Sequence, residues 1–341
     1  MDSLTQYALI DLHLHLDGSL SPEWILTTAR QQNIPLPADN VADLLRHIAA
    51  PQDCTSLNDY LQCFAIPVRM LQTAENLASA TADLVKRLDA SGLIYAEIRF
   101  APQLHTQQGL TQRQAVEAVL AGVQQTLPHT AMFGVNVILC CMRGEHNQAE
   151  NVQTVQLAKD FLGKGVVATD LAGAEAIYPT AQFASLFELA NQLGVPFTLH
   201  AGEADGAESV KSALDFGAKR IGHGVRASED PNLLARLKAE KTTLEMCPCS
   251  NLQTKTVRLL ADYPLRHFLQ QGIKATLNTD NMTVSQTTLA SEFRLLSQGY
   301  VLTHPEAKQL LTNAIDGAFL SEQEKRELRE RVAQRLAQYV A

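Results

Sequence analysis

Short runs of apolar and β-branched residues recur along the chain, and each is followed by polar or glycine residues and then by a stretch with helical spacing of apolar side chains. We expect eight strands, at Ala8–Leu14, Leu93–Phe100, Phe133–Cys141, Val166–Leu171, Pro196–His200, Arg220–Gly222, Thr243–Met246 and Ala275–Asn278. Amphipathic stretches separate them, among them Gln114–Gln125, Ala181–Leu193 and Glu208–Phe216. Strands that alternate with helices are typical of a parallel sheet. Eight such units favour a TIM-type (β/α)8 barrel, with an open doubly wound sheet as the alternative.

Two regions add helices to this simple alternation. Residues from about Ser21 to Lys86 are mostly helical, which is more than one crossover needs, and this insertion after the first strand could cover the barrel mouth. Ser321–Val340 is expected to form a C-terminal helix, because Ser321 and Glu324 have the spacing of a capping box. No linker, repeat or low-complexity segment interrupts the sequence. Since barrels of this length form one domain, we expect a single domain over residues 1–341.

The charge balance and the apolar pattern limit the partners and the compartment. The formal net charge of −8 disfavours a nucleic acid as partner and is easier to reconcile with a small neutral ligand. No run of about 18 apolar residues predicts a membrane span, and Met1–Gln6 lacks the basic and then apolar order of a signal peptide. The six cysteines are expected to be free, buried thiols. These features indicate a cytoplasmic protein without a membrane or nucleic-acid partner.

Ionisable residues stand where the expected strands end. His13 and His15 close the first strand, and residues two apart in a strand point to the same side. His200 ends the fifth strand, His223 follows the sixth, and Asp280 follows the eighth. In a barrel the carboxyl ends of all strands meet at one mouth, where active sites lie. We therefore expect these five residues, most of them distant in sequence, to meet in space.

Imidazoles and a carboxylate are good ligands for Zn²⁺ or a similar divalent ion. Each residue alone has a plainer interpretation, because a buried histidine can be a satisfied core residue and an aspartate can cap a turn. Their joint occurrence at separate strand ends favours a metal site. The histidines without this context are expected to be solvated or structural, namely His47, His129, His146, His267 and His304. His105, just beyond a strand end, is left open between the two interpretations.

Several segments match the motifs of one enzyme family in the same order. They are Asp11–Gly18, Tyr95–Pro102, Cys140–Arg143, Asp170–Gly173, His200–Glu203, Arg220–Gly224 and Asn278–Asp280. Phe319–Ser321 and the charged helix after it also resemble the end of that family's chain. The sequence thus resembles the adenosine deaminases of the amidohydrolase superfamily over nearly its whole length.

The resemblance implies a ligand set and acid–base groups. By this resemblance, one Zn²⁺ per chain is held by four ligands, namely His13, His15, His200 and Asp280. Glu203 is the implied proton donor to purine N1, and His223 is the implied residue that polarises the attacking water, with Asp280 sharing in proton transfer. Zinc can bring the pKa of a bound water towards about 7. Glu203 would need a raised pKa, which burial beneath a purine can supply.

The resemblance also implies contacts to the substrate. His15 and Asp17 are placed beside it, with Asp17 accepting from ribose hydroxyls, and the backbone N–H of Gly173 is placed opposite purine N3. An apolar helix is implied to flank the pocket, although an ordinary core stripe has the same spacing. Its residues are Leu57, Tyr60, Leu61 and Phe64.

Two positions depart from the family pattern. Where the family often has a second aspartate and then a proline, this chain has Asn281 and Met282. An aspartate must carry a proton to donate to purine N7, whereas the Asn281 amide already has donor hydrogens, so we expect N7 recognition to be preserved. Ala174 stands where the family commonly has an aspartate, so a carboxylate is missing near the purine site.

The implied activity is hydrolytic deamination in purine salvage, of adenosine to inosine and ammonia and of 2′-deoxyadenosine to the corresponding deoxynucleoside and ammonia. Adenine or another adenosine-like compound is the alternative substrate. A two-metal amidohydrolase would need a bridging carboxylate or modified lysine at the fourth strand, but Lys164 lies before that strand. A cytidine-deaminase-type site would need Pro-Cys-x-x-Cys, and Pro248–Asn251 lacks the second cysteine. A binding protein without catalysis is disfavoured, because every expected metal and acid–base residue is present.

Overall fold

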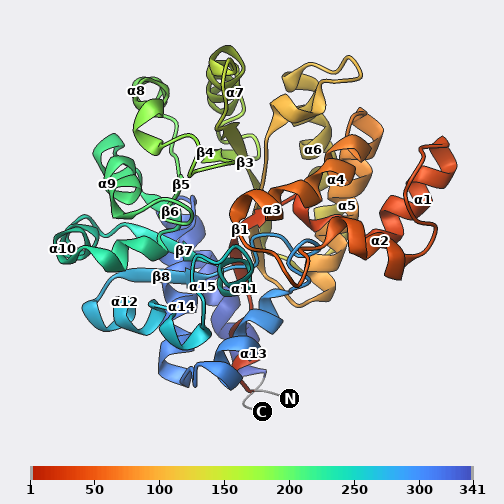
Figure 1. The fold of residues 1–341 in the computed structure, drawn as a ribbon. Helices are drawn as coiled ribbons and strands as arrows, with labels where there is room; N and C mark the ends of the chain where they lie inside the picture. The colour runs from red at the N-terminus through yellow and green to blue at the C-terminus, as the bar shows by residue number, and fades with distance from the viewer. Residues whose placement is uncertain (1–2, 339–341) are drawn as a thin grey trace.

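The computed structural model describes residues 3–338 and contains two four-stranded parallel sheets, with strand orders β1-β2-β3-β4 and β5-β6-β7-β8 (Figure 1). The strands are β1 Ile10–His15, β2 Tyr95–Phe100, β3 Gly134–Met142, β4 Val166–Ala172, β5 His200–Ala201, β6 Arg220–His223, β7 Thr243–Met246 and β8 Lys274–Leu277. Most of their residues are buried, as expected for strands covered on both faces.

Two isolated parallel bridges join the sheets at both seams. Leu14 pairs with Asp280 at one seam, and Thr169 pairs with Phe197 at the other. The backbone N–H of Asp280 donates to the carbonyl of His13 at 2.8 Å, and the N–H of His15 donates to the carbonyl of Asp280 at 2.7 Å. The strands therefore form a ring with helices outside it (Figure 1), which confirms the expected barrel over the open sheet.

The fifth strand differs from its expected bounds. Residues Pro196–His200 were expected to pair, but β5 comprises only His200–Ala201. Proline has no N–H to donate, so the preceding stretch bonds β4 only through Thr169, which donates to the carbonyl of Pro196 and accepts from the N–H of Thr198. The chain is extended there, but its ladder is too sparse to form a regular strand.

Helices connect the strands around the outside of the ring. Beyond the insertion they are α6 Gln112–Thr126, α7 Gln148–Asp160, α8 Ala184–Leu193, α9 Ala207–Phe216, α10 Pro231–Glu240, α11 Pro248–Gln253, α12 Leu265–Gln271, α13 Leu289–Gly299 and α14 His304–Gly317. Side-chain caps begin several of them: Thr111 starts α6 and Thr303 starts α14 with capping boxes. Gly194, at φ 67°, ends α8 in the left-handed conformation that glycine adopts without strain.

Short 3-10 helices occupy several of the connections. They are η1 Ser3–Tyr7, η2 Asp17–Ser19, η3 Gln62–Phe64, η4 Pro102–His105, η5 Leu127–His129, η6 Thr180–Phe183, η7 Val225–Glu229 and η8 Leu260–Asp262. Within the described residues, no helix is long and apolar enough to cross a membrane. The six cysteines are free thiols, as expected, and all but Cys249 are buried.

The region between β1 and β2 is helical, as expected. Its helices are α1 Pro22–Gln32, α2 Val41–Ile48, α3 Leu57–Leu61, α4 Ala65–Met70 and α5 Ala74–Ala90. Residues of α3, η3 and α4 line a cavity at the barrel mouth, so this part of the insertion covers the carboxyl ends of the strands. The expected apolar stripe therefore has both roles: its side chains line the cavity and also pack together in one hydrophobic cluster. They are Leu57, Tyr60, Leu61 and Phe64.

The C-terminal helix α15 spans Glu322–Ala337, and its start has the expected capping box between Ser321 and Glu324. The expected end at Val340 lies outside the described residues. Leu328 and Val332 are the buried residues of α15. They belong to a cluster with residues of β1, β2 and α14, so α15 covers one side of the barrel wall near the strand starts.

Candidate active site

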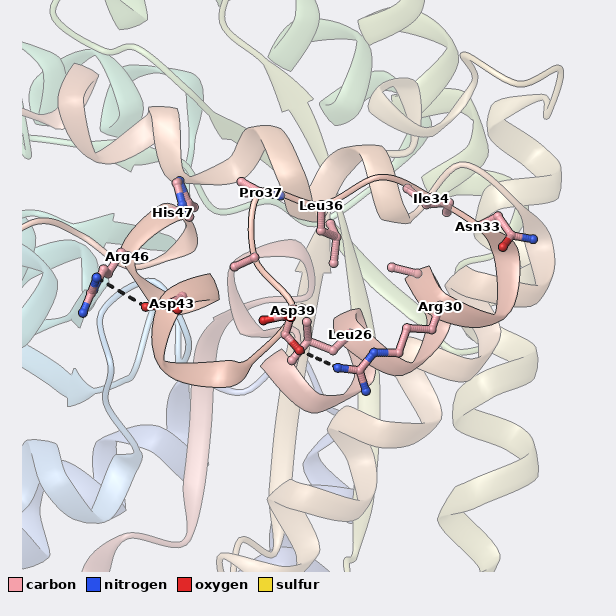
Figure 2. A pocket seen from close by; sticks show the side chains of 12 residues that line it. Leu26, Arg30, Asn33, Ile34, Leu36, Pro37, Asp39, Asp43, Arg46 and His47 are labelled. Atoms are coloured by element: carbon pink, nitrogen blue, oxygen red, sulfur yellow. Dashed lines mark hydrogen bonds and ion pairs between the residues drawn. The ribbon is translucent and has the colours of Figure 1, made fainter.

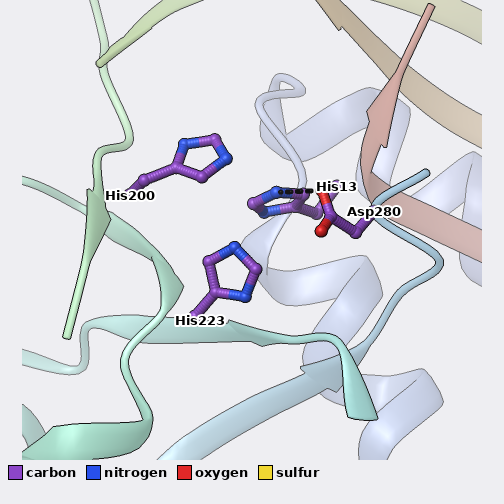
Figure 3. Close-up of side chains that lie close together, drawn as sticks. All are labelled: His13, His200, His223 and Asp280. Atoms are coloured by element: carbon purple, nitrogen blue, oxygen red, sulfur yellow. Dashed lines mark ion pairs between the residues drawn. The ribbon is translucent and has the colours of Figure 1, made fainter. Parts of the chain in front are cut away.

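The five ionisable residues expected to meet do lie together at the carboxyl ends of the strands, and Figure 3 shows four of them, His13, His200, His223 and Asp280. One ligand atom from each of His13, His200, His223 and Asp280 lies within 4.8 Å of the others. His15 joins this group, because its Nε2 lies 3.1 Å from Nε2 of His200 and 3.4 Å from Oδ1 of Asp280. Barrel closure has thus gathered residues from both ends of the chain.

Two of these residues have unusual backbone conformations. His223 has φ 61° and Asp280 has φ 60°, in the left-handed region that residues other than glycine rarely adopt. For Asp280, the paired hydrogen bonds to the backbone of β1 hold the peptide in place. Such conformations persist where surrounding structure over-determines them, and they cluster at functional sites.

The chemistry of the donor set fits a divalent metal. Burial lowers the pKa of His15 and of His223 well below the ordinary value, so both rings are neutral at pH 7 and keep a lone pair for a ligand. Nε2 of buried His13 makes no hydrogen bond with the described residues, although Oδ1 of Asp280 lies 3.4 Å away. A buried nitrogen without a hydrogen bond is costly unless something else engages it. A metal ion among these side chains would do so.

Glu203 has the environment of a protonated carboxylic acid. Its side chain is 4% exposed, and Oε2 lies 3.6 Å from Nε2 of His223. Burial raises the pKa of Glu203 well above its usual value, and the negative charges of Asp280 and Glu175 raise it further. This environment favours the protonated acid over the carboxylate.

Glu175 positions the loop that carries Glu203, a role the sequence did not indicate. Its carboxylate accepts the backbone N–H groups of Gly202 at 2.6 Å and of Glu203 at 2.9 Å. It also accepts the N–H groups of Ala204 and Asp205. Four donors on one buried carboxylate fix the loop directly after β5. The only feature of the sequence that could have indicated this role is the position of Glu175, two residues after Gly173.

A cavity of about 330 Å³ opens beside this group, and it contains every expected site residue except His13 in its wall. Asp17 lies in the wall, and burial raises its pKa to about 6. Gly173 adopts φ 105°, and a Cβ there would lie 3.3 Å from the Met142 side chain. Asn281 also lines the cavity, with its Oδ1 buried and making no hydrogen bond with the described residues.

A second cavity, of about 810 Å³, lies on the outside of the insertion between α1 and α2 (Figure 2). Its charged groups bond nearby partners: Arg30 donates to the carbonyl of Asp39, and Arg46 lies 3.3 Å from Asp43. None of the strand-end residues lines it. The volume of a cavity therefore does not identify the active site, because most of the ionisable residues at the strand ends line the smaller of these two cavities.

The remaining histidines divide as expected. Those expected to be solvated or structural are all exposed, namely His47, His129, His146, His267 and His304. His105, left open by the sequence, is buried with its ring centroid 5.8 Å from that of Phe100. Burial lowers its pKa to about 4, and it does not line the cavity. His105 is a neutral core residue.

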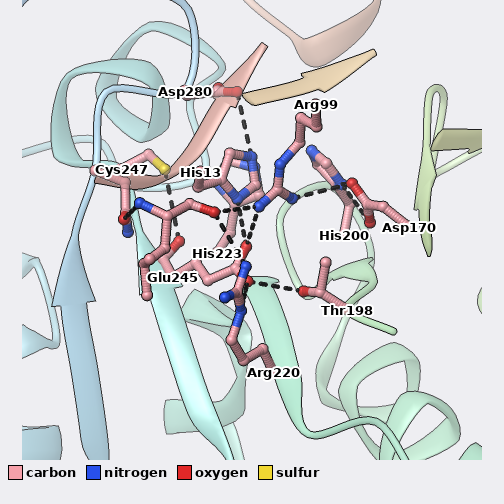
Figure 4. Close-up of polar contacts among 12 residues, drawn as sticks. His13, Arg99, Asp170, Thr198, His200, Arg220, His223, Glu245, Cys247 and Asp280 are labelled. Atoms are coloured by element: carbon pink, nitrogen blue, oxygen red, sulfur yellow. Dashed lines mark hydrogen bonds and ion pairs between the residues drawn. The ribbon is translucent and has the colours of Figure 1, made fainter. Parts of the chain in front are cut away.

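Carboxylates behind the histidines were missed by sequence reasoning. Nδ1 of His13 donates to Glu245 at 2.7 Å, and Nδ1 of His200 lies 3.0 Å from Asp170 (Figure 4). Nδ1 of His223 is paired with the side-chain amide of Asn251 at 3.0 Å. Histidines that bind metals almost always hold such a partner on the other ring nitrogen, which fixes the tautomer.

The fold and the site define a metal-dependent hydrolase with an amidohydrolase-type barrel. A family profile described as adenosine deaminase matches residues 8–335. Adenosine deaminase of Haemophilus ducreyi is 56% identical over 340 residues, covering 99% of both chains, and that of Enterococcus faecalis is 47% identical, covering 96% of this chain and 97% of the relative. The chain belongs to the adenosine deaminase family.

Solved structures agree with this fold. The adenine deaminase from Arthrobacter aurescens has a TM-score of 0.87 at 27% identity, covering 96% of this chain and 99% of that chain. An N6-mAMP deaminase from Arabidopsis has a TM-score of 0.84 at 24% identity, covering 96% of this chain and 99% of that chain, and shows likeness of fold alone.

Proposed function

We propose that this chain hydrolyses adenosine to inosine and 2′-deoxyadenosine to 2′-deoxyinosine, releasing ammonia in each case, with one Zn²⁺, as a single catalytic domain acting in purine salvage in the cytoplasm. One observation carries the proposal: buried Glu203, whose pKa is raised by burial, lies 3.6 Å from Nε2 of His223 and lines the same cavity as His15, His200 and Asp280. Deamination at C6 of a purine needs an acid for N1 on one side and an activated water on the other. Relatives named as adenosine deaminases, similar over nearly their full length, support the same reaction.

His13, His15, His200 and Asp280 would hold the zinc. The group of mutually close ligand atoms contains His223 in place of His15, so the choice of His15 over His223 rests on the family resemblance and on orientation. Nε2 of His15 is turned towards His200, whereas Nε2 of His223 is turned towards Glu203. When bound, the metal would supply a water of lowered pKa at neutral pH.

The chain's own residues would then move the protons. Oxygen of the water attacks C6, electron density moves onto N1, and N1 takes the proton of Glu203. His223 orients the water, and Asp280 takes one of its protons and passes it to the 6-amino group. The C6–N bond breaks and ammonia leaves, while the second water proton restores Glu203. Adenosine and water thus give inosine and ammonia with no proton left over.

Four residues in the cavity wall would contact the nucleoside. Asp17 would accept hydrogen bonds from the ribose hydroxyls, and His15 would lie beside the ribose. The N–H of Gly173 would donate to N3, because the absence of a side chain there permits close approach. Asn281 would donate its amide to N7. A Cβ on Gly18 would lie 1.7 Å from Oδ1 of Asn281, so this glycine leaves the space that the amide occupies.

The Asn281 assignment predicts a change in substrate binding. Replacing Asn281 with Leu keeps the branched shape but removes the donor to N7, so kcat/KM for adenosine should fall on the order of tenfold. Steady-state kinetics on Asn281→Leu would measure the loss, with Asn281→Asp, the residue that the family often has, as the shape-conserving comparison. Unchanged kinetics in Asn281→Leu would remove the assignment.

A substrate panel tests the function directly. Purified, metal-replete protein would be given adenosine, 2′-deoxyadenosine and adenine, and the ultraviolet change on deamination followed while bound metal is counted. We expect one zinc per chain and turnover of the nucleosides on the order of 1–10³ s⁻¹. Preference for adenine would favour the activity named for the Arthrobacter structure. Tight binding without turnover, or two occupied metal sites, would contradict the proposal.

A further inference from the structure

One guanidinium inside the barrel touches the carboxylates behind two of the clustered histidines. Arg99 lies on β2 with its side chain 0% exposed. Its Nη1 donates to Oδ2 of Asp170 at 3.0 Å, and its Nη2 donates to Oε2 of Glu245 at 2.8 Å (Figure 4). Nη2 also donates to the backbone carbonyl of Leu12 on β1 at 2.6 Å. Arg99 therefore joins three other strands of the ring from its own.

The two carboxylates that bind Arg99 also bind the imidazoles. At Glu245 the same oxygen, Oε2, serves both. At Asp170, Arg99 bonds Oδ2, whereas Nδ1 of His200 is hydrogen-bonded to Oδ1 at 3.2 Å. Oε2 of Glu245 lies 2.7 Å from Nδ1 of His13, and Oδ2 of Asp170 lies 3.0 Å from Nδ1 of His200. A hydrogen bond at Nδ1 fixes the ring orientation and leaves Nε2 as the ligand atom. Because one rigid fork holds both carboxylates, its geometry sets the separation of these two groups and, through them, the separation of the two rings.

We propose that Arg99 is a positioning residue that orients His13 and His200 as a pair by clamping Glu245 and Asp170. The inference rests on the metal centre of the proposed function, but not on its substrate. A planar guanidinium with donors on two nitrogens can bond two carboxylates in a fixed geometry, whereas a lysine ammonium acts as a single point charge. Preorganised ligand rings bind a metal more tightly than rings that must be ordered on binding.

Charge neutralisation alone does not account for Arg99. Glu245 already has a second cation, because Nε of Arg220 donates to its other oxygen, Oε1, at 2.5 Å. Thr198 donates to the same Oε1 at 2.9 Å. What Arg99 adds is the connection from Glu245 across to Asp170, which no other described side chain is recorded to make.

Arg220 provides a matched control within the same network. It is as deeply buried as Arg99, at 1% exposed, and also bonds Glu245 and the carbonyl of Leu12. Its remaining contacts face away from the histidines: Glu97, the carbonyl of Gly317 and the ring of Phe319. Replacing Arg220 therefore removes a buried guanidinium without releasing Asp170.

Metal affinity of the full-length Arg99→Lys and Arg220→Lys variants tests the proposal. Each protein would be stripped with a chelator and titrated with Zn²⁺ against a chromophoric competitor, with the visible spectrum of the Co²⁺ form recorded and thermal stability measured without metal. We expect Arg99→Lys to weaken Zn²⁺ binding ten- to a hundredfold and to change the Co²⁺ spectrum. Arg220→Lys should weaken binding about threefold or less and keep the parental spectrum.

Equal losses of affinity in the two variants would overturn the proposal, because they would reflect general damage to the core. So would parental affinity in Arg99→Lys. If Arg99→Lys does not fold, Asp170→Asn decides the matter: the same shape without the carboxylate should weaken Zn²⁺ binding at least tenfold, and parental affinity would overturn the proposal. No substrate enters these titrations, so a parent protein that fails to deaminate adenosine would refute the proposed function and leave this inference standing.

Discussion

Glu203 can be replaced to test its role as an acid without removing a ligand of the metal. The side chain lies near Asp280 and His223 but belongs to the loop after β5, so its removal need not disturb the ligands. Replacing Glu203 with Gln keeps the shape and removes the acidic proton, so kcat should fall about 10²- to 10⁴-fold while metal content is unchanged. Metal analysis and the ultraviolet assay on the same preparation would measure both.

Asp205→Asn is the matched control for this prediction. It makes the same chemical change two residues further along the loop, outside the cavity wall. Its kcat should remain close to that of the parent. If Glu203→Gln retained activity, another group would have to protonate N1, and the assignment of the acid would be wrong.

Glu292 on α13 predicts a pH dependence of stability. Its carboxyl is fully buried, and burial raises its pKa to about 8, although the hydroxyl of Thr287 and the N–H of Cys249 lower it in part. A folded-state pKa above the ordinary value of 4.5 means that folding favours the protonated form. The protonated Glu292 therefore makes its full contribution to the free energy of unfolding below about pH 4.5, and this contribution is lost as the pH rises to about 8.

Glu292→Gln should flatten this dependence, because the amide does not ionise. Urea unfolding at pH 5 and pH 8 would show the parent losing more stability than the variant over that interval. The exposed Glu330→Gln should behave as the parent does. Parallel curves for parent and Glu292→Gln would contradict the raised pKa.

At the scale of single residues, some site residues could be predicted from the sequence and others could not, for a physical reason. His13, His200 and Asp280 interrupt or end apolar runs, and the ends of barrel strands point to one mouth. Asp170, Glu245 and Arg99 lie inside the runs, and a run buried on both faces does not reveal which side chains face the barrel interior. Their partners come from other strands, so even the motifs that contain Arg99 and Asp170 do not indicate these contacts.

At the scale of elements, patterns with a local cause were predicted well. The start of α15 follows from Ser321 and Glu324, and β7 has the expected bounds. The expected bounds of β5 were wrong, because its pairing depends on where β4 and β6 lie and because Pro196 has no N–H to donate. Element boundaries that depend on a distant neighbour are not encoded in the residues of the element.

The packing of helix α15 on the barrel predicts that a substitution in this helix will lower the stability of the protein. Only Leu328 and Val332 of this helix are buried, and Leu336 packs partly against the same cluster, so the attachment of the helix to the barrel wall depends largely on Leu328, which is fully buried among residues of β1, β2 and α14. Leu328→Ala should lower the free energy of unfolding by about 2–5 kcal/mol. Leu259→Ala, at a site 63% exposed, makes the same change and should cost little.

Denaturant unfolding of both variants would measure the difference. Because α15 lies near the strand starts, the active site at the opposite ends should keep its kinetics in the folded fraction. Equal stability of Leu328→Ala and Leu259→Ala would show that α15 does not contribute to the cooperative core.

At the scale of the whole molecule, the site exists only when the ring is closed. His13 belongs to the first strand and Asp280 follows the last, and the backbone bonds between them form one seam. The other seam places His200 beside the first sheet through Thr169 and Phe197. A metal held by residues from both sheets would therefore bind the folded ring and not the unfolded chain.

Metal removal should consequently destabilise the whole protein. Binding to the folded state alone adds RT ln(1 + [L]/Kd), about 4 kcal/mol at a free metal concentration of a thousand times Kd. Stripping the parent with a chelator should lower its melting temperature by several degrees, and adding Zn²⁺ back should restore it. Asp280→Asn lacks one ligand across the seam, so its melting temperature should already be low and should respond weakly to chelator or to added Zn²⁺. A parent whose melting temperature is unchanged after verified loss of metal would mean that the ion does not tie the first and last strands together.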